Sequence, residues 1–96
     1  MPDLSKHRMT GWEWYGEYRS RLGMEACLRY INSVYKLLAE MKPGGFFVIE
    51  KNVRAENIDL FIKTCCMFIQ ESRHSREKTP AIYEFNSGYT QIKRRQ

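Results

Sequence analysis

Residues 58–69 read IDLFIKTCCMFI and form the most apolar stretch of the chain, interrupted by only three polar side chains. Asn52 precedes this stretch and can cap a helix, and no glycine or proline divides residues 52–72. A helix over 52–72 would be apolar on nearly every face. We therefore expect it at the centre of the fold, with an apolar surface for a partner as the alternative.

Two further helices are expected before this stretch. Thr10 and Glu13 have the spacing of a capping box, which predicts a helix that begins there and ends at Gly23. A single apolar stripe over residues 24–41 predicts a second, amphipathic helix. It should stop at Lys42-Pro43-Gly44-Gly45, because proline disfavours helix at the residue before it and glycines permit a turn.

Short β-prone runs lie on both sides of the apolar stretch. Residues 45–51 are aromatic and β-branched, which predicts a strand, and a glycine-containing turn at 86–89 between two such runs predicts a hairpin. The expected fold class is α+β, with a three-stranded sheet carrying helices on one side. Residues 10–96 should form a single domain, preceded by a flexible N-terminus over residues 1–9.

The composition excludes several classes of protein. With 96 residues, 43% hydrophobic content and a net charge of +5, the chain is expected to form one small basic domain. Its longest uncharged apolar run is far too short for a bilayer span, and its beginning does not read as a signal peptide, so we expect a cytoplasmic protein. Three cysteines make no disulfide framework, and the sequence has no catalytic or phosphate-binding motif. We expect no enzyme, cofactor, metal site or small-molecule substrate.

Most of the positive charge lies near the C-terminal end. Residues 73–96 hold six cations against Glu77 and Glu84, which gives this segment +4 of the net +5. A basic loop followed by a basic hairpin could bind phosphates of DNA or RNA, while the alternative is a merely solvated basic end. The expected nucleic-acid-binding residues are Arg73, Arg76, Lys78, Tyr89, Lys93, Arg94 and Arg95.

The first helix is unusually aromatic. Trp12, Trp14, Tyr15 and Tyr18 place four aromatic side chains within seven residues, and one helix cannot turn all of them into one core. These four residues are expected at a protein interface, either of a homodimer or with a host protein that this chain inhibits or recruits. The alternative is that the helix packs on the protein's own core.

The second half of the chain resembles small winged-helix-like domains of phages and mobile elements. The resemblance rests on the turn and strand at 42–49, the helix after them, and a hairpin ending in Gln91-Ile92-Lys93-Arg94-Arg95. The aromatic-arginine ending common in those domains is missing. A winged-helix order also needs a short helix before the long one, which only residues 53–57 could supply. The resemblance implies nucleic-acid binding and a mobile-element origin.

Overall fold

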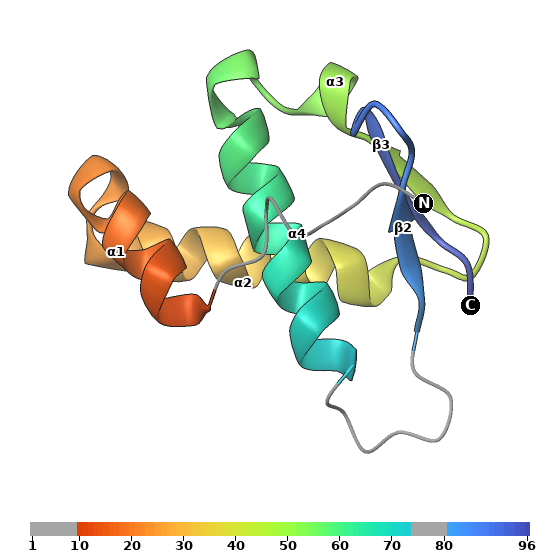
Figure 1. Cartoon of the computed structure of the whole chain (residues 1–96), viewed down its shortest axis with the longest axis horizontal. Helices are drawn as coiled ribbons and strands as arrows, with labels where there is room; N and C mark the ends of the chain where they lie inside the picture. Colours follow the sequence, from red (N-terminus) through yellow and green to blue (C-terminus); the bar gives the residue numbers. More distant parts are fainter. Residues whose placement is uncertain (1–9, 74–80) are drawn as a thin grey trace.

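The computed structural model describes residues 10–73 and 81–96, which form helices and a small antiparallel sheet (Figure 1). In chain order the elements are α1 (Gly11–Leu22), α2 (Met24–Glu40), β1 (Phe46–Val48), α3 (Ile49–Asn52), the 3-10 turn η2 (Ala55–Asn57), α4 (Ile58–Arg73), β2 (Tyr83–Phe85) and β3 (Gln91–Arg94). The predicted α+β class is confirmed, and the order of elements agrees broadly with the prediction.

The first two helices begin and end where their capping residues predict. The Thr10 hydroxyl accepts a hydrogen bond from the Glu13 backbone N–H at 3.2 Å, which satisfies one of the free donors at the start of α1. Gly23 separates α1 from α2 with a φ of 83°, a conformation that a side chain would disfavour. The predicted helical ends near residues 10, 23 and 41 are therefore confirmed.

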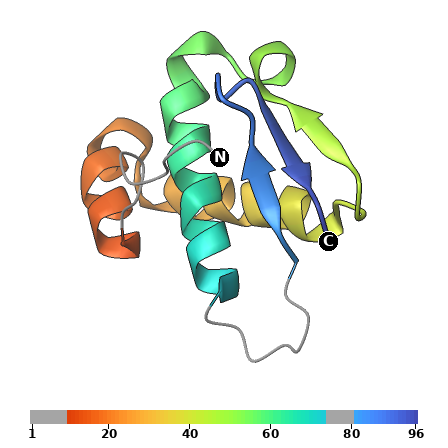
Figure 2. The ribbon, with the colours of Figure 1, turned by 45° about the vertical axis from the view of Figure 1, so that its right-hand side comes forward.

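Helix α4 lies between α1 and the sheet, and α2 crosses beside it (Figures 1 and 2). Two groups of buried side chains meet on it. We call the first the sheet cluster, formed by Val34, Leu38, Ile49, Phe61, Ile62, Cys65, Cys66, Ile69, Tyr83, Phe85 and Ile92. The second is the α1 cluster, formed by Trp14, Tyr18, Cys27, Leu60 and Met67. The prediction that the apolar stretch occupies the centre of the fold is confirmed.

The sheet has the strand order β1-β3-β2, with both pairs antiparallel. Phe47 and Phe85 both lie opposite Ile92 on β3, and Ile92 is completely buried. Because side chains alternate across a sheet, this register turns one row of apolar residues toward α2 and α4. The helices lie on one side of the sheet, as Figure 2 shows.

The segment between β1 and α4 differs from the expected one. The strand predicted over 45–51 ends at Val48, and α3 begins at Ile49, whose side chain is fully buried. The Asn52 amide donates to the Val48 carbonyl at 2.7 Å, so it closes this short helical turn and does not cap the long helix. The long helix starts at Ile58, six residues later than predicted. Of residues 53–57, the segment considered for a short helix, the structure makes 55–57 the 3-10 turn η2, and α3 lies just before this segment.

Candidate nucleic-acid interface

The sheet face opposite the sheet cluster presents an aromatic side chain beside cations. Phe46 on β1 lies opposite Lys93 on β3, and Phe46 is 61% exposed. Its neighbour Phe47 turns the other way and stacks on Phe61 of α4, with ring centroids 5.4 Å apart. Phe46 and Lys93 therefore lie together on the outer face of the sheet.

Positive charge continues along this face at the end of β3. Arg95 follows Lys93 by two residues and therefore faces the same side of the strand. Its side chain is 67% exposed and forms a salt bridge with Glu84, with Nη1 and Oε1 3.0 Å apart. Lys42 is exposed in the turn before β1. This turn lies next to the end of β3, because the Gly44 N–H donates a hydrogen bond to the Arg94 carbonyl. We call Phe46, Lys93 and Arg95, together with the exposed Lys42 in the adjoining turn, the outer-face patch.

Two of the residues expected to bind nucleic acid, Arg94 and Tyr89, are half-buried and make contacts within the fold. The Arg94 guanidinium donates to the Met41 carbonyl and, through Nε, to the Gln96 carbonyl at 3.0 Å. Tyr89 has a φ of 55° in the hairpin turn, and its ring lies 5.5 Å from that of Phe85. Arg94 thus ties the end of the sheet to the end of α2, and Tyr89 lies on the edge of the sheet cluster.

The remaining predicted cations lie at or beyond the end of α4. Arg73 is the last residue of α4, and Arg76 and Lys78 lie outside the described residues. Of the seven residues predicted to bind nucleic acid, the structure brings Lys93 and Arg95 together on an exposed surface. Phe46, which the sequence analysis did not single out, lies opposite Lys93 on this surface, and Lys42 is exposed in the adjoining turn.

Helix α4 is poorly placed to enter a DNA groove, because polar contacts from α1 cover one of its faces. The Trp14 indole N–H donates to the Thr64 hydroxyl at 2.8 Å, and the Tyr18 hydroxyl donates to Asp59 at 2.9 Å. Lys63 lies between two carboxylates, 2.8 Å from Glu17 and 3.1 Å from Asp59. The helix that follows the short helical segment is thus enclosed, whereas a base-reading helix has an open face.

The aromatic residues of α1 divide between the interior and the surface. Trp14 and Tyr18 are buried, at 0% and 3% exposed, so the expectation that they form a protein interface is wrong for these two. Their rings lie 5.2 Å apart in the α1 cluster. Tyr15 is half-buried beneath the Arg19 guanidinium, and Trp12 is 85% exposed. Trp12 is the member of the group that a partner could reach fully.

The three cysteines are buried free thiols. Burial raises the pKa of Cys66 to about 11 and raises that of Cys65 and Cys27, so each thiol keeps its proton at neutral pH. Within residues 10–73 and 81–96, no three His, Cys, Asp or Glu side chains are grouped so that they could hold a metal ion. None of the described helices combines the length and apolarity needed to cross a membrane.

Comparison with known protein families, curated proteins and solved structures finds no match for this chain. The residues themselves therefore carry the functional argument.

Phe46 is the exposed residue of this surface that sequence reasoning missed. The run Phe46-Phe47-Val48-Ile49 is apolar at every position, so its pattern does not indicate which side chains face the core. A small sheet with helices on one side must expose alternate residues of each strand. Two consecutive phenylalanines in such a strand place one ring in solvent, and this was the available signal.

Proposed function

We propose that this protein binds single-stranded nucleic acid on the outer face of its sheet. The observation that carries the proposal is the exposed Phe46 ring, at 61% exposure, directly opposite Lys93 on the neighbouring strand. An exposed aromatic ring can stack on an unpaired base, and cations beside it can contact the phosphates. Phe46 supplies the stacking surface, and Lys42, Lys93 and Arg95 supply the charge.

A single strand fits this surface better than a duplex. Stacking on Phe46 requires a base that is free of its neighbours, which a single strand offers at little cost. A duplex is read in the major groove by a helix or by a two-stranded β-ribbon, and α4 is not available as that helix, because α1 covers it through Trp14, Tyr18 and Lys63. The order of elements resembles that of winged-helix-like domains, but the contact surface that we propose is the sheet.

Two features of the chain support this proposal. Arg73, Arg76 and Lys78 precede β2 in the sequence and add positive charge to the segment that leads into the sheet. The buried thiols are unpaired, as in proteins of a reducing compartment, where nucleic acids also occur. We therefore propose a cytoplasmic protein, and a mobile-element origin remains part of the proposal through the resemblance of its second half.

Fluorescence anisotropy with labelled oligonucleotides tests the proposal. We expect oligothymidine and mixed-sequence single strands to bind more tightly than a duplex of the same length. Three phosphate contacts, from Lys42, Lys93 and Arg95, predict a slope of about −2 for log K against log salt with single strands. If no salt-dependent binding appears below about 100 μM at low salt, the proposal is wrong.

The variant Phe46→Ala tests the stacking step. It should weaken binding by about 1–3 kcal/mol, roughly 5- to 150-fold, because one base loses its stacking partner while every cation remains. Trp12→Ala is the matched control, since it removes a more exposed aromatic ring from α1, away from the sheet. Equal losses in the two variants would show that binding does not use the outer face of the sheet.

A second candidate function rests on Trp12. We propose that its ring, 85% exposed, marks a protein interface, either of a homodimer or with a host protein. A tryptophan anchor at an interface commonly accounts for about 2 kcal/mol or more of the binding energy. We expect Trp12→Ala to shift a dimer toward monomer in sedimentation experiments or to abolish capture of the partner. If the protein with Trp12 intact sediments as a monomer and captures no partner, this second candidate is wrong.

A further inference from the structure

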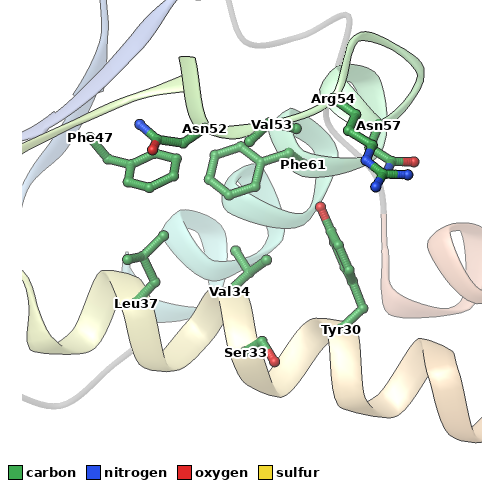
Figure 3. A pocket seen from close by; sticks show the side chains of 10 residues that line it. All are labelled: Tyr30, Ser33, Val34, Leu37, Phe47, Asn52, Val53, Arg54, Asn57 and Phe61. Carbon is green, nitrogen blue, oxygen red and sulfur yellow. The ribbon is translucent and has the colours of Figure 1, made fainter. Parts of the chain in front are cut away.

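A groove of about 420 Å³ opens between α2 and the segment from β1 to α4 (Figure 3). Its volume is in the range of sites that hold one small organic molecule. It lies on the helix side of the sheet, so it is distinct from the outer-face patch. Neither proposed function uses it.

The groove has an apolar wall built from the sheet cluster and its neighbours. Val34 and Leu37 line it from α2, and Phe47 and Phe61 line it from the opposite side (Figure 3). The two phenylalanine rings stack on each other, which holds this wall in one arrangement. An apolar body placed here would be removed from water against packed side chains.

One end of the groove is polar and positively charged. Arg54 lines it there and forms no salt bridge within the part of the chain that the structure describes. Arg21 reaches the same end, where its guanidinium donates to the Asn57 side-chain oxygen at 2.8 Å. No carboxylate is among the residues that line the groove, so this end favours an anion.

Tyr30 adds a hydrogen-bond donor to this charged end. Its ring stacks on Trp14, with centroids 6.5 Å apart, which fixes the side chain on α2. The hydroxyl points across the groove toward the segment that carries Arg54 and Asn57 (Figure 3). Burial raises the pKa of Tyr30 to about 12, so the hydroxyl keeps its proton at neutral pH and can donate.

We propose that the groove binds an amphipathic carboxylate, with its apolar body against Val34, Leu37 and Phe61 and its carboxylate between Arg54 and the Tyr30 hydroxyl. Guanidinium and carboxylate form strong charge-assisted hydrogen bonds, and a hydroxyl donor strengthens the preference for an anion. The apolar wall selects an alkyl or aryl body over a small inorganic ion. This ligand class departs from the expectation that the protein takes no small molecule.

Decanoate, used below its micelle concentration, is the probe for this site. We expect saturable chemical-shift changes in amide spectra of the full chain, confined to α2, β1 and residues 49–61. 1-Decanol and decyltrimethylammonium have the same chain without the negative charge, and each should bind at least tenfold more weakly. Absence of saturable changes up to about 1 mM, or equal binding of the three compounds, would overturn the proposal.

Arg54 and Lys51 are both exposed and give a matched pair of variants. Arg54→Gln should weaken decanoate binding at least tenfold, whereas Lys51→Gln removes the same charge three residues away, outside the groove lining, and should change it less than twofold. Tyr30→Phe keeps the stacking on Trp14 and should weaken binding about threefold or more, for one lost hydrogen bond. Circular dichroism checks that each variant is folded. Equal effects of Arg54→Gln and Lys51→Gln would reduce the result to general charge attraction and overturn the site.

Discussion

The two sides of α4 are attached to the rest of the molecule by different kinds of contact. Toward the sheet, Phe61, Cys65 and Ile69 pack against apolar side chains of α2 and the strands. Toward α1, Thr64 accepts the Trp14 indole N–H, and Lys63 bonds to Glu17. The named contacts of α4 with the sheet cluster are therefore apolar, whereas those with α1 add directional polar bonds. The Tyr83 hydroxyl of the sheet cluster donates to the Leu38 carbonyl at 2.7 Å, but this bond joins β2 to α2 and does not involve α4.

This difference follows from what each partner offers. Helix α1 buries only Trp14 and Tyr18, and both side chains carry a polar atom that must find a partner when buried. The Thr64 hydroxyl accepts a hydrogen bond from the Trp14 indole and donates one to the Leu60 carbonyl at 2.7 Å, so the buried hydroxyl is satisfied. The position of α1 on α4 is thus fixed by a few specific hydrogen bonds. We therefore expect single substitutions to detach α1 more easily than the sheet.

The largest effect is expected from Trp14→Ala. Trp14 is completely buried, and its removal should lower the free energy of unfolding by about 3–5 kcal/mol, through lost burial and a cavity against Leu60 and Met67. Urea unfolding measures this change. Trp12→Ala, on the same helix but exposed, should cost less than about 0.5 kcal/mol.

Hydrogen exchange on Trp14→Ala also tests whether the two clusters are separable. If the α1 cluster opens by itself, amides of α1 lose protection while those of β3 keep theirs. Equal loss of protection in α1 and β3 would show that the clusters unfold as one unit.

The next effect depends on pH and acts on the sheet cluster. In the unfolded chain Cys66 loses its proton near its ordinary pKa of 9.0, whereas burial raises the folded pKa to about 11. The stability that Cys66 contributes is therefore present below pH 9 and is lost as pH rises to about 11. Two pKa units correspond to roughly 3 kcal/mol.

Urea unfolding at several pH values checks this prediction, with Cys66→Ala as the comparison. The variant should be less stable at neutral pH, because its side chain is smaller, but should lose less stability between pH 9 and 11. Burial also raises the pKa of Cys65 and of Cys27. These two thiols should therefore cause part of the loss of stability in both proteins. An identical decline in both proteins would contradict the assignment to Cys66.

The fold was largely predictable because its elements have local signals. Thr10 marks a helix start through its side-chain hydroxyl, and Gly23 and Pro43 mark helix ends through their backbone chemistry. Each end lies within a few residues of the prediction. The start of α4 was not predictable in this way. Burial of Ile49 in the sheet cluster, a tertiary contact, bends the chain into α3 and uses the Asn52 side chain there.

The candidate site was less predictable because it depends on which side of an element faces the core. Charge alone does not distinguish Arg94 from its neighbours Lys93 and Arg95, although only the Arg94 guanidinium donates a hydrogen bond to the Met41 carbonyl. Alternation along β3 does distinguish them, but only once the partner strands and the side that carries the helices are known. For the same reason, the aromatic residues of α1 could be counted from the sequence but not sorted into buried and exposed.

The smallest effect is expected at the rim of the α1 cluster, from Glu17→Gln. The substitution removes one of the two carboxylates that hold Lys63, and Asp59 remains 3.1 Å from the ammonium group. The Glu17 side chain is 43% exposed, so water screens the pair and the loss should be about 0.3–1 kcal/mol. The loss should shrink in about 1 M salt, where charges interact over only about 3 Å. Glu40→Gln, at the exposed end of α2, is the matched control. A loss of stability that does not depend on salt and is as large as that of Trp14→Ala would contradict this expectation. It would mean that the Glu17–Lys63 bond, and not the buried Trp14 indole, holds α1 on α4.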